Sequence, residues 1–279
     1  DAVATRKHIF IGCTALSRVG ISDLSNYLLI TFSGDSSHPF YASTATSRGL
    51  YLNGDLIEDL VIPDGVTSIE QYAFYKNNTI KSITIPSSVT SIGTSAFQGC
   101  TSITDFESPC SLNQNSIGNS GNTTGVLTIH GNLTCQGSNS STTSWIRLLK
   151  YKEIIITGNL TIGSNCALTS SSYTQTIRIG GNCTGGGSGL ISSTSSRLMF
   201  VEIMGTVTSY LFYSTYYPAS SSILHLGRSD AIMSFSQLHY SESSRATTIS
   251  RISKIYVGPG ESAEGDQAVL DMYLADTDW

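Results

Sequence analysis

Three side chains suited to chemistry recur at nearly equal intervals in the second half of the chain. Arg178, Glu202 and His225 are separated by 24 and 23 residues, and each lies in a short stretch that alternates polar and apolar residues. Stacked parallel strands would bring them together at a spacing of about 4.8 Å. A guanidinium, a carboxylate and an imidazole in one row could bind a sugar or act as a catalytic acid and base.

We interpret these three residues as a surface salt bridge beside a solvated histidine, because surface ion pairs are common and weak. No second carboxylate is expected nearby, so an acid/base pair would be incomplete. The same alternation extends the outward-facing set, which includes Thr84 on an earlier strand. The predicted ligand-binding candidate is an exposed ladder of Thr128, Ile155, Arg178, Glu202, His225 and Tyr256.

A run rich in aromatic residues, from Tyr210 to Tyr217, provides an alternative site. These rings could stack on sugars or anchor a protein partner, or they could cover the core on the side opposite the ladder. The structural interpretation is favoured, since alternate members of the run should face inward. The alternative ligand-binding patch consists of Tyr210, Tyr213, Tyr216 and Tyr217.

The motifs of the common catalytic classes are missing from the sequence. It contains no GxSxG, no HExxH and no phosphate-binding loop, and the GGGSG at Gly185 lacks the required lysine. The five histidines lie in separate segments, and the six cysteines show no zinc-ligand spacing. We therefore expect no enzyme activity, no cofactor and no metal. Cys13 and Cys100 both follow Phe-x-Gly, which predicts buried thiols; whether any cysteines pair is left open.

The elements that must position these residues are clearest from Leu60 to Phe106, where the chain repeats itself every 23 residues. Ile62-Pro63 returns as Ile85-Pro86, and Ala73-Phe74 returns as Ala96-Phe97. A fixed period of about 20–29 residues is typical of leucine-rich-repeat solenoids. Each unit is predicted to contain a strand, a second short extended piece and one or two helical turns, which fall at 94–99 in the second unit. Phe74 and Phe97 are expected to be buried and stacked on each other.

These units resemble the BspA-like leucine-rich repeats of the Treponema/Bacteroides surface-antigen type. The resemblance is carried by "IPDGVTSIEQYAF" from Ile62 and "IPSSVTSIGTSAFQGCTSIT" from Ile85. "FIGCTALSRVGI" from Phe10 and "FYASTATSRGLYLNGDLIEDLVIP" from Phe40 extend it, so that it covers about 9–106. It implies an adhesin-like or other cell-surface bacterial protein that binds a host protein or a cell-surface ligand.

Beyond Phe106 the consensus is lost, but the period continues. The stretches "VLTIHGNLT", "EIIITGNLT", "TIRIGGNCT" and "FVEIMGTVT" align Gly131, Gly158, Gly181 and Gly205. Each predicts a strand, a tight turn and a second strand, with the recurring asparagines of Asn-x-Ser/Thr sequons as turn residues rather than glycosylation sites. Residues 143–152 ("TSWIRLLKYK") are expected in the helical half, with Trp145, Leu148 and Leu149 facing the core.

The predicted fold class is therefore a strand-dominated α+β repeat protein, a leucine-rich-repeat solenoid that continues into degenerate β-rich repeats. Its predicted parts are BspA-like repeats over 1–107, degenerate repeats of the same superhelix over 108–257 and a C-terminal capping helix over 258–279. The open end of a solenoid needs such a cover. One continuous solenoid is expected from Ile9 to Val257.

Composition restricts the function further. The charged fraction is 13% and the net charge is −5, with basic residues scattered, so a nucleic-acid partner is not expected. No apolar run is long enough to span a membrane. We expect a non-catalytic, monomeric, secreted or cell-surface protein whose exposed sheet binds a protein or glycan on a cell surface. The alternatives are a glycan-binding module or polysaccharide-active enzyme, and a phage or appendage fibre tip.

Overall fold

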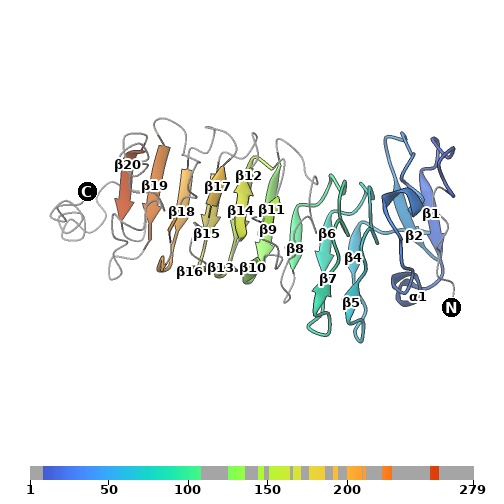
Figure 1. Cartoon of the computed structure of the whole chain (residues 1–279), viewed down its shortest axis with the longest axis horizontal. Helices are drawn as coiled ribbons and strands as arrows, with labels where there is room; N and C mark the ends of the chain where they lie inside the picture. Colours follow the sequence, from blue (N-terminus) through green and yellow to red (C-terminus); the bar gives the residue numbers. More distant parts are fainter. Residues whose placement is uncertain are drawn as a thin grey trace.

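The computed structural model is an elongated stack of short strands, with strand β1 near one end and β20 near the other (Figure 1). The described residues are 9–107, 125–135, 144–147, 151–163, 166–170, 176–185, 191–193, 200–208, 210–211, 222–227 and 252–257. All structural statements below refer to them. The predicted capping helix over 258–279 lies outside this part of the chain, and the division at 107/108 stays a prediction.

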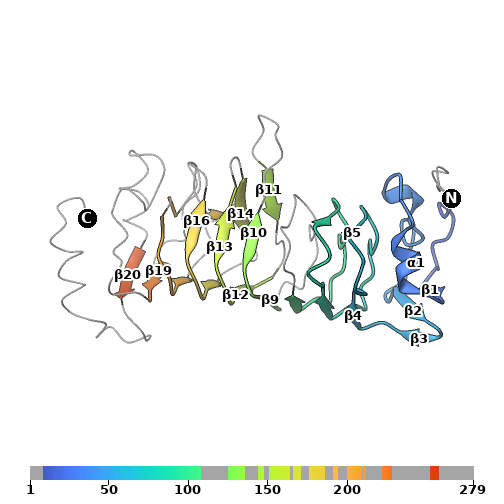
Figure 2. The same ribbon diagram turned by 90° about the horizontal axis from the view of Figure 1, so that it is seen from below.

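One parallel sheet of nine strands runs along most of the stack and forms one long side of it (Figure 2). Each strand comes from a successive unit of the sequence and pairs with the strands of the units before and after it. In order, the strands are β4 (Asp59–Val61), β6 (Ser82–Thr84), β8 (Asp105–Glu107), β9 (Val126–His130), β12 (Glu153–Ile156), β15 (Thr176–Ile179), β18 (Phe200–Ile203), β19 (Ser222–Leu226) and β20 (Ile252–Val257).

Smaller parallel sheets form the other sides of the coils. One consists of β10 (Leu133–Cys135), β13 (Leu160–Ile162) and β16 (Cys183–Gly185), and another of β11 (Ser144–Arg147), β14 (Cys166–Ser170) and β17 (Ile191–Ser193). In the leucine-rich-repeat part, β5 (Ser68–Ile69) pairs with β7 (Ser91–Ile92). The strand-dominated repeat fold predicted from the sequence is confirmed.

The N-terminal end departs from this regular pattern. Strand β1 (Arg18–Ile21) pairs in parallel with β2 (Gly49–Leu52), which forms an antiparallel hairpin with β3 (Asp55–Leu56). Between β1 and β2 lie the short helix α1 (Leu24–Leu28) and the 3-10 helix η1 (Asp35–Ser37). These strands form a sheet of their own, so the single sheet begins at β4 rather than at the first predicted unit.

Two expectations about helices are wrong. Ser144–Arg147 is strand β11, not part of a helix, because its main chain pairs with β14 of the next coil. Leu148 and Leu149 lie outside the described residues. Residues 94–99 form tight turns instead of helical turns, and Ser95 and Gly99 have φ of 60° and 82°. The preceding unit has φ of 60° at Tyr72 and 57° at Lys76, so left-handed residues at these two positions break the helix in both units.

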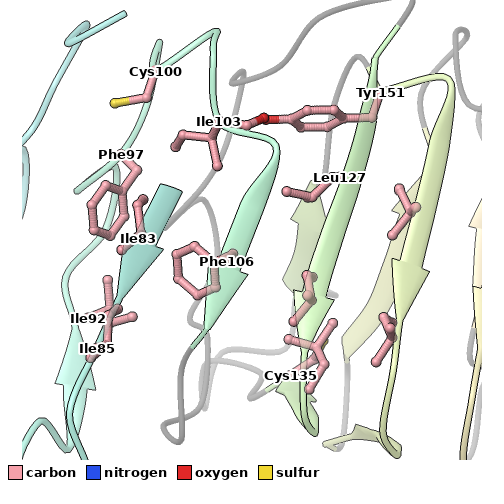
Figure 3. Close-up of a cluster of buried hydrophobic side chains, with 14 of the residues drawn as sticks. Ile83, Ile85, Ile92, Phe97, Cys100, Ile103, Phe106, Leu127, Cys135 and Tyr151 are labelled. Atoms are coloured by element: carbon pink, nitrogen blue, oxygen red, sulfur yellow. The ribbon is translucent and has the colours of Figure 1, made fainter. Parts of the chain in front are cut away.

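The core is continuous across the units. Phe74 and Phe97 are 1% and 0% exposed, and their rings stack at 5.3 Å between centroids with 4° between planes, as the 23-residue repeat predicts. Ile83, Ile92 and Phe106 pack beside them (Figure 3). Cys100 is buried as expected, and its thiol donates to the Phe74 carbonyl at 3.0 Å. Cys13 is exposed, so the prediction of a buried thiol is wrong at that position.

Glycine and asparagine make the turns between β9 and β10 and in the coils that follow. A Cβ on Gly158 would lie 2.5 Å from the Gly131 carbonyl oxygen, so only glycine permits the observed stacking. The Asn159 amide donates to Asn132 Oδ1 at 2.8 Å, and the Asn182 amide donates to Asn159 Oδ1 at 2.7 Å. Each asparagine therefore caps the turn of the next coil, which confirms the predicted turn role.

Candidate ligand-binding face

The register of the nine-stranded sheet brings the predicted ladder residues into one row. Thr128 pairs with Ile155, Ile155 with Arg178, Arg178 with Glu202, Glu202 with His225, and His225 with Tyr256. The same row continues toward the N terminus through Asp105, Ser82 and Asp59. We call these nine positions the outward row, since the alternate residues of the described strands point into the core. Thr84 belongs to a neighbouring row, with Glu107 and His130.

The centre of the row is a hydrogen-bonded charge cluster. Arg178 Nε donates to Glu153 Oε1 at 2.8 Å, and Arg178 Nη1 donates to Glu202 Oε2 at 2.8 Å. The guanidinium also lies over the ring of Phe200, 4.7 Å from its centroid. On the far side, His225 Nδ1 lies 2.8 Å from Glu202 Oε1. Four neighbouring strands, β12, β15, β18 and β19, are linked in this way.

This geometry corrects two sequence-based expectations. Glu153 is a second carboxylate beside Arg178, although none was expected. His225 is only 2% exposed, so it is a buried histidine bound to a carboxylate rather than a solvated one. The predicted ladder is thus half-buried at its charged centre. The side chain of Tyr256 lies outside the described part of the structure, and only its main-chain register is known.

The cluster changes the ionisation of its members. Partial burial would raise the pKa of Glu202, but hydrogen bonds from Arg178 and His225 and their charges outweigh it and lower that pKa. Desolvation likewise opposes the charge of Arg178, and the bonds to Glu202 and Glu153 raise its pKa instead. Glu202 is therefore ionised at neutral pH, and its Oε1 accepts a hydrogen bond from His225 Nδ1. The guanidinium is held by two carboxylates and an aromatic face, so its chief effect is to fasten strands together.

The sequence indicated Arg178, Glu202 and His225 but missed Glu153 and Phe200. Glu153 pairs across the strands with Thr176, and Thr176 pairs with Phe200, one row away from the Arg178 row. The repeat register could have indicated both residues. Glu153 and Phe200 lie two positions before Ile155 and Glu202, and residues two apart in a strand lie on the same face of the sheet. Longer side chains reach diagonally between rows, which a ladder of directly opposed residues does not include.

The N-terminal half of the face is acidic and more open. Ser82 Oγ donates to Asp59 Oδ1 at 2.6 Å, and His130 Nε2 lies 3.3 Å from Asp105 Oδ1. Val61 is 61% exposed and Val126 is 38% exposed. A hollow of about 450 Å³ adjoins this end and is lined by Leu52, Asn53, Asp55, Leu56, Ile57, Glu58 and Asp59. Exposed apolar side chains beside carboxylates give this half the features of a docking surface.

The alternative aromatic patch is only partly described. Tyr210 is half-buried beside the fully buried Leu211. Tyr213, Tyr216 and Tyr217 lie outside the described residues, so the patch stays a prediction. Among the described residues, no group of three or more His, Cys, Asp or Glu side chains is arranged to hold a metal ion. In the same part of the chain, no helix has the length and apolarity needed to cross a membrane.

Stacked coils with a parallel sheet along one side define a repeat solenoid. Comparison with protein families gives the type of repeat: residues 46–139 match the BspA type leucine rich repeat region in six copies. The chain therefore carries a BspA-type leucine-rich-repeat region, and the resemblance found in the sequence is confirmed. The matched region begins after the expected start at Ile9 and ends beyond Phe106. No curated protein and no solved structure matches the chain.

Proposed function

We propose that this chain is a non-catalytic, secreted or cell-surface binding protein that holds a protein ligand on the outward face of its nine-stranded sheet. The observation that carries the proposal is the unbroken outward row, which aligns one residue from each of nine successive strands. Corresponding positions of successive repeats form an extended surface in solenoid proteins, and such surfaces commonly bind ligands.

The repeat type supports the same proposal. Proteins with BspA-type repeats are typically surface proteins that act in protein interactions. On this chain, the N-terminal half of the face combines exposed Val61 and Val126 with Asp59, Asp105 and Glu107. Apolar groups surrounded by charged ones suit a protein ligand, because the apolar groups supply affinity and the charged ones select the partner.

The Arg178 cluster has a supporting part in this proposal. Its guanidinium already donates to both neighbouring carboxylates, so ligand contacts fall more naturally on the half-exposed residues of the row that precede it. Ile155 is the half-buried apolar member of the row next to this cluster. We therefore place the centre of the ligand footprint between Asp59 and Ile155.

A pair of variants from the same coil tests the proposal. Ile155→Asp adds a charge to the outward row, whereas Thr161→Asp adds the same charge to β13, on another side of the coil. Both proteins would be checked for native circular dichroism and then titrated against immobilised host-cell surface and matrix proteins. The proposal expects Ile155→Asp to weaken binding about tenfold or more and Thr161→Asp to leave it unchanged. Equal loss in both variants, or binding by neither variant nor wild type, would contradict it.

A further inference from the structure

A groove between α1 and the first of the two 23-residue units is separate from the outward face. It has a volume of about 440 Å³, and its lining includes Leu28, Leu29, Asp64, Val66, Ser68 and Glu70. In Figure 1, α1 and β5 lie at the same edge of the stack, next to each other along its length. Strand β5 lies across the coil from β4 and the nine-stranded sheet (Figure 2). We call this site the α1 groove.

The α1 groove has an apolar base and an exposed apolar rim. Leu28 is buried at 4% exposure, and Val66 packs against the core. Leu29, directly after the helix, is 78% exposed, the largest exposed fraction among the large apolar side chains of the described residues. A leucine this exposed beside a concave surface has apolar area available for a partner.

The wall of the groove supplies negative charge without a basic counterpart. Asp64 and Glu70 both line it, and no lysine or arginine does. In the described part of the chain, neither carboxylate forms a salt bridge. Ser68 Oγ donates to Glu70 Oε1 at 3.1 Å and so helps to hold this carboxylate at the wall.

The 23-residue repeat shows that this charge is not required by the fold. The following unit keeps Val89 and Ile92 in place of Val66 and Ile69, which serve the core. At the positions of Asp64 and Glu70, however, it has Ser87 and Gly93. The acidic side chains therefore occur only in the unit that faces α1, although the backbone pattern is the same.

The main chain at the groove also offers an open strand edge. Strand β5 belongs to a two-stranded sheet and pairs only with β7 among the described residues. On its other side lies α1 rather than another strand. An extended peptide can add to such an edge through main-chain hydrogen bonds, while pockets receive its alternate side chains.

We infer that the α1 groove binds an extended segment of a partner protein in which a lysine or arginine lies next to an apolar residue. The basic side chain pairs with Asp64 and Glu70, and the apolar one covers Leu29 and Val66. This site does not depend on ligand binding by the outward row, and the two can be tested independently.

The direct test uses two synthetic peptides, acetyl-Thr-Leu-Lys-Leu-Thr-amide and its counterpart with glutamate in place of lysine. Methyl NMR spectra of the whole chain would be recorded during titration at low ionic strength. We expect the lysine peptide to shift the Leu28, Leu29 and Val66 methyl signals, and the glutamate peptide to leave them in place. Added salt should weaken the binding, since exposed ion pairs are screened.

Matched variants establish which carboxylates are responsible. Asp64→Asn combined with Glu70→Gln should weaken lysine-peptide binding about tenfold, whereas the exposed control Asp55→Asn should leave it unchanged. Leu29→Ser should weaken binding of both the peptide and its arginine analogue. The inference is overturned if the glutamate peptide binds equally well, if the double variant binds like wild type, or if no methyl signal moves. Equal shifts with cadaverine or Ca²⁺ alone would also overturn it, since they would indicate a small-cation site.

Discussion

The phenol of Tyr151 donates a hydrogen bond to the main-chain carbonyl oxygen of Ile103 at 2.7 Å, across 48 residues of sequence. Tyr151 is fully buried, and burial raises its pKa above the ordinary range of a tyrosine. Ile103 closes the second 23-residue unit, and Tyr151 precedes β12 in the later coils. Figure 3 shows the Tyr151 ring above Leu127, with its hydroxyl oxygen toward Ile103, within one core. The bond thus fastens the regular repeats to the degenerate ones.

Replacing Tyr151 with phenylalanine tests this connection. The ring keeps its packing, but the Ile103 carbonyl loses its donor in a dry environment, so we expect a loss of about 1–2 kcal/mol in the free energy of unfolding. The half-buried Tyr51→Phe serves as the control and should change stability by less than about 0.5 kcal/mol. Equal effects in urea titrations of the two variants would show that the bond adds nothing to stability.

The phenylalanine stack of the 23-residue units should be costly to interrupt. Phe97 is 0% exposed and lies between Phe74 and Phe106, with ring centroids at 5.3 Å and 6.0 Å. Phe97→Ala should destabilise the chain by about 3–5 kcal/mol because it removes buried area and leaves a cavity. Val61→Ala, at an exposed position of the sheet, should be nearly neutral in the same denaturant titration. A loss below about 1 kcal/mol for Phe97→Ala would contradict the core described above.

The turn glycines of the later coils predict a steric effect. A methyl group on Gly158 would lie within 2.5 Å of the Gly131 carbonyl oxygen, whereas a methyl group on Gly20 in β1 meets nothing within 4 Å. Gly158→Ala should therefore cost about 1–3 kcal/mol, and Gly20→Ala should have little effect. Thermal unfolding of both variants is sufficient to compare them, and similar melting temperatures would argue against close stacking at the turns.

His38 gives the N-terminal region a defined pH dependence. Its ring is 1% exposed among Phe32, Phe40 and Tyr75, and Nδ1 accepts a hydrogen bond from the Phe40 amide at 3.1 Å. Burial, with a further contribution from the charge of Lys76, lowers the pKa of His38 to about 3, although the nearby main chain of Ala73 opposes this shift. The folded chain then holds a neutral imidazole, while the unfolded chain takes up a proton below pH 6.5.

Because the folded pKa is the lower one, stability should be constant above pH 6.5 and fall as the pH drops toward about 3. The slope attributable to His38 is about 1.4 kcal/mol per pH unit, or about 2 kcal/mol between pH 6.5 and pH 5. His38→Phe should remove this component, so the variant should gain about 2 kcal/mol in stability relative to wild type between pH 6.5 and pH 5. Parallel curves from pH 7 to pH 5 would show that His38 is not buried in neutral form.

The sequence predicted the stack well where the repeat is regular. The recurrence of Phe74 as Phe97 and the alternation around Ile154, Ile177 and Val201 predict burial directly. Each repeat of the sequence forms one coil, and the alternate residues of its strand point into the core. It failed at Ser144–Arg147, where Trp145 and the leucines that follow have helical spacing but the main chain pairs with the neighbouring coil. Pairing partners so far apart in sequence leave no local pattern, and the same is true of the Tyr151–Ile103 bond.

The candidate site was predicted in its register but not in its environment. Direct opposition of Arg178, Glu202 and His225 followed from the period, whereas the diagonal contact of Arg178 with Glu153 and the burial of His225 did not. Diagonal contacts depend on side-chain length and rotamer, and burial depends on neighbouring chain segments. Neither property is encoded in the alternation of one strand.

The proposed binding face can be tested most directly by site-specific photo-cross-linking. A benzophenone amino acid would be introduced at Ile155 in the outward row and, in a second protein, at Thr161 on β13 of the same coil. Each protein would be irradiated with the surface or matrix protein that binds the wild type. A ligand on the outward face predicts a cross-linked product from position 155 and none from position 161. A product from position 161 alone would place the ligand on another side of the coil and contradict the proposed binding face.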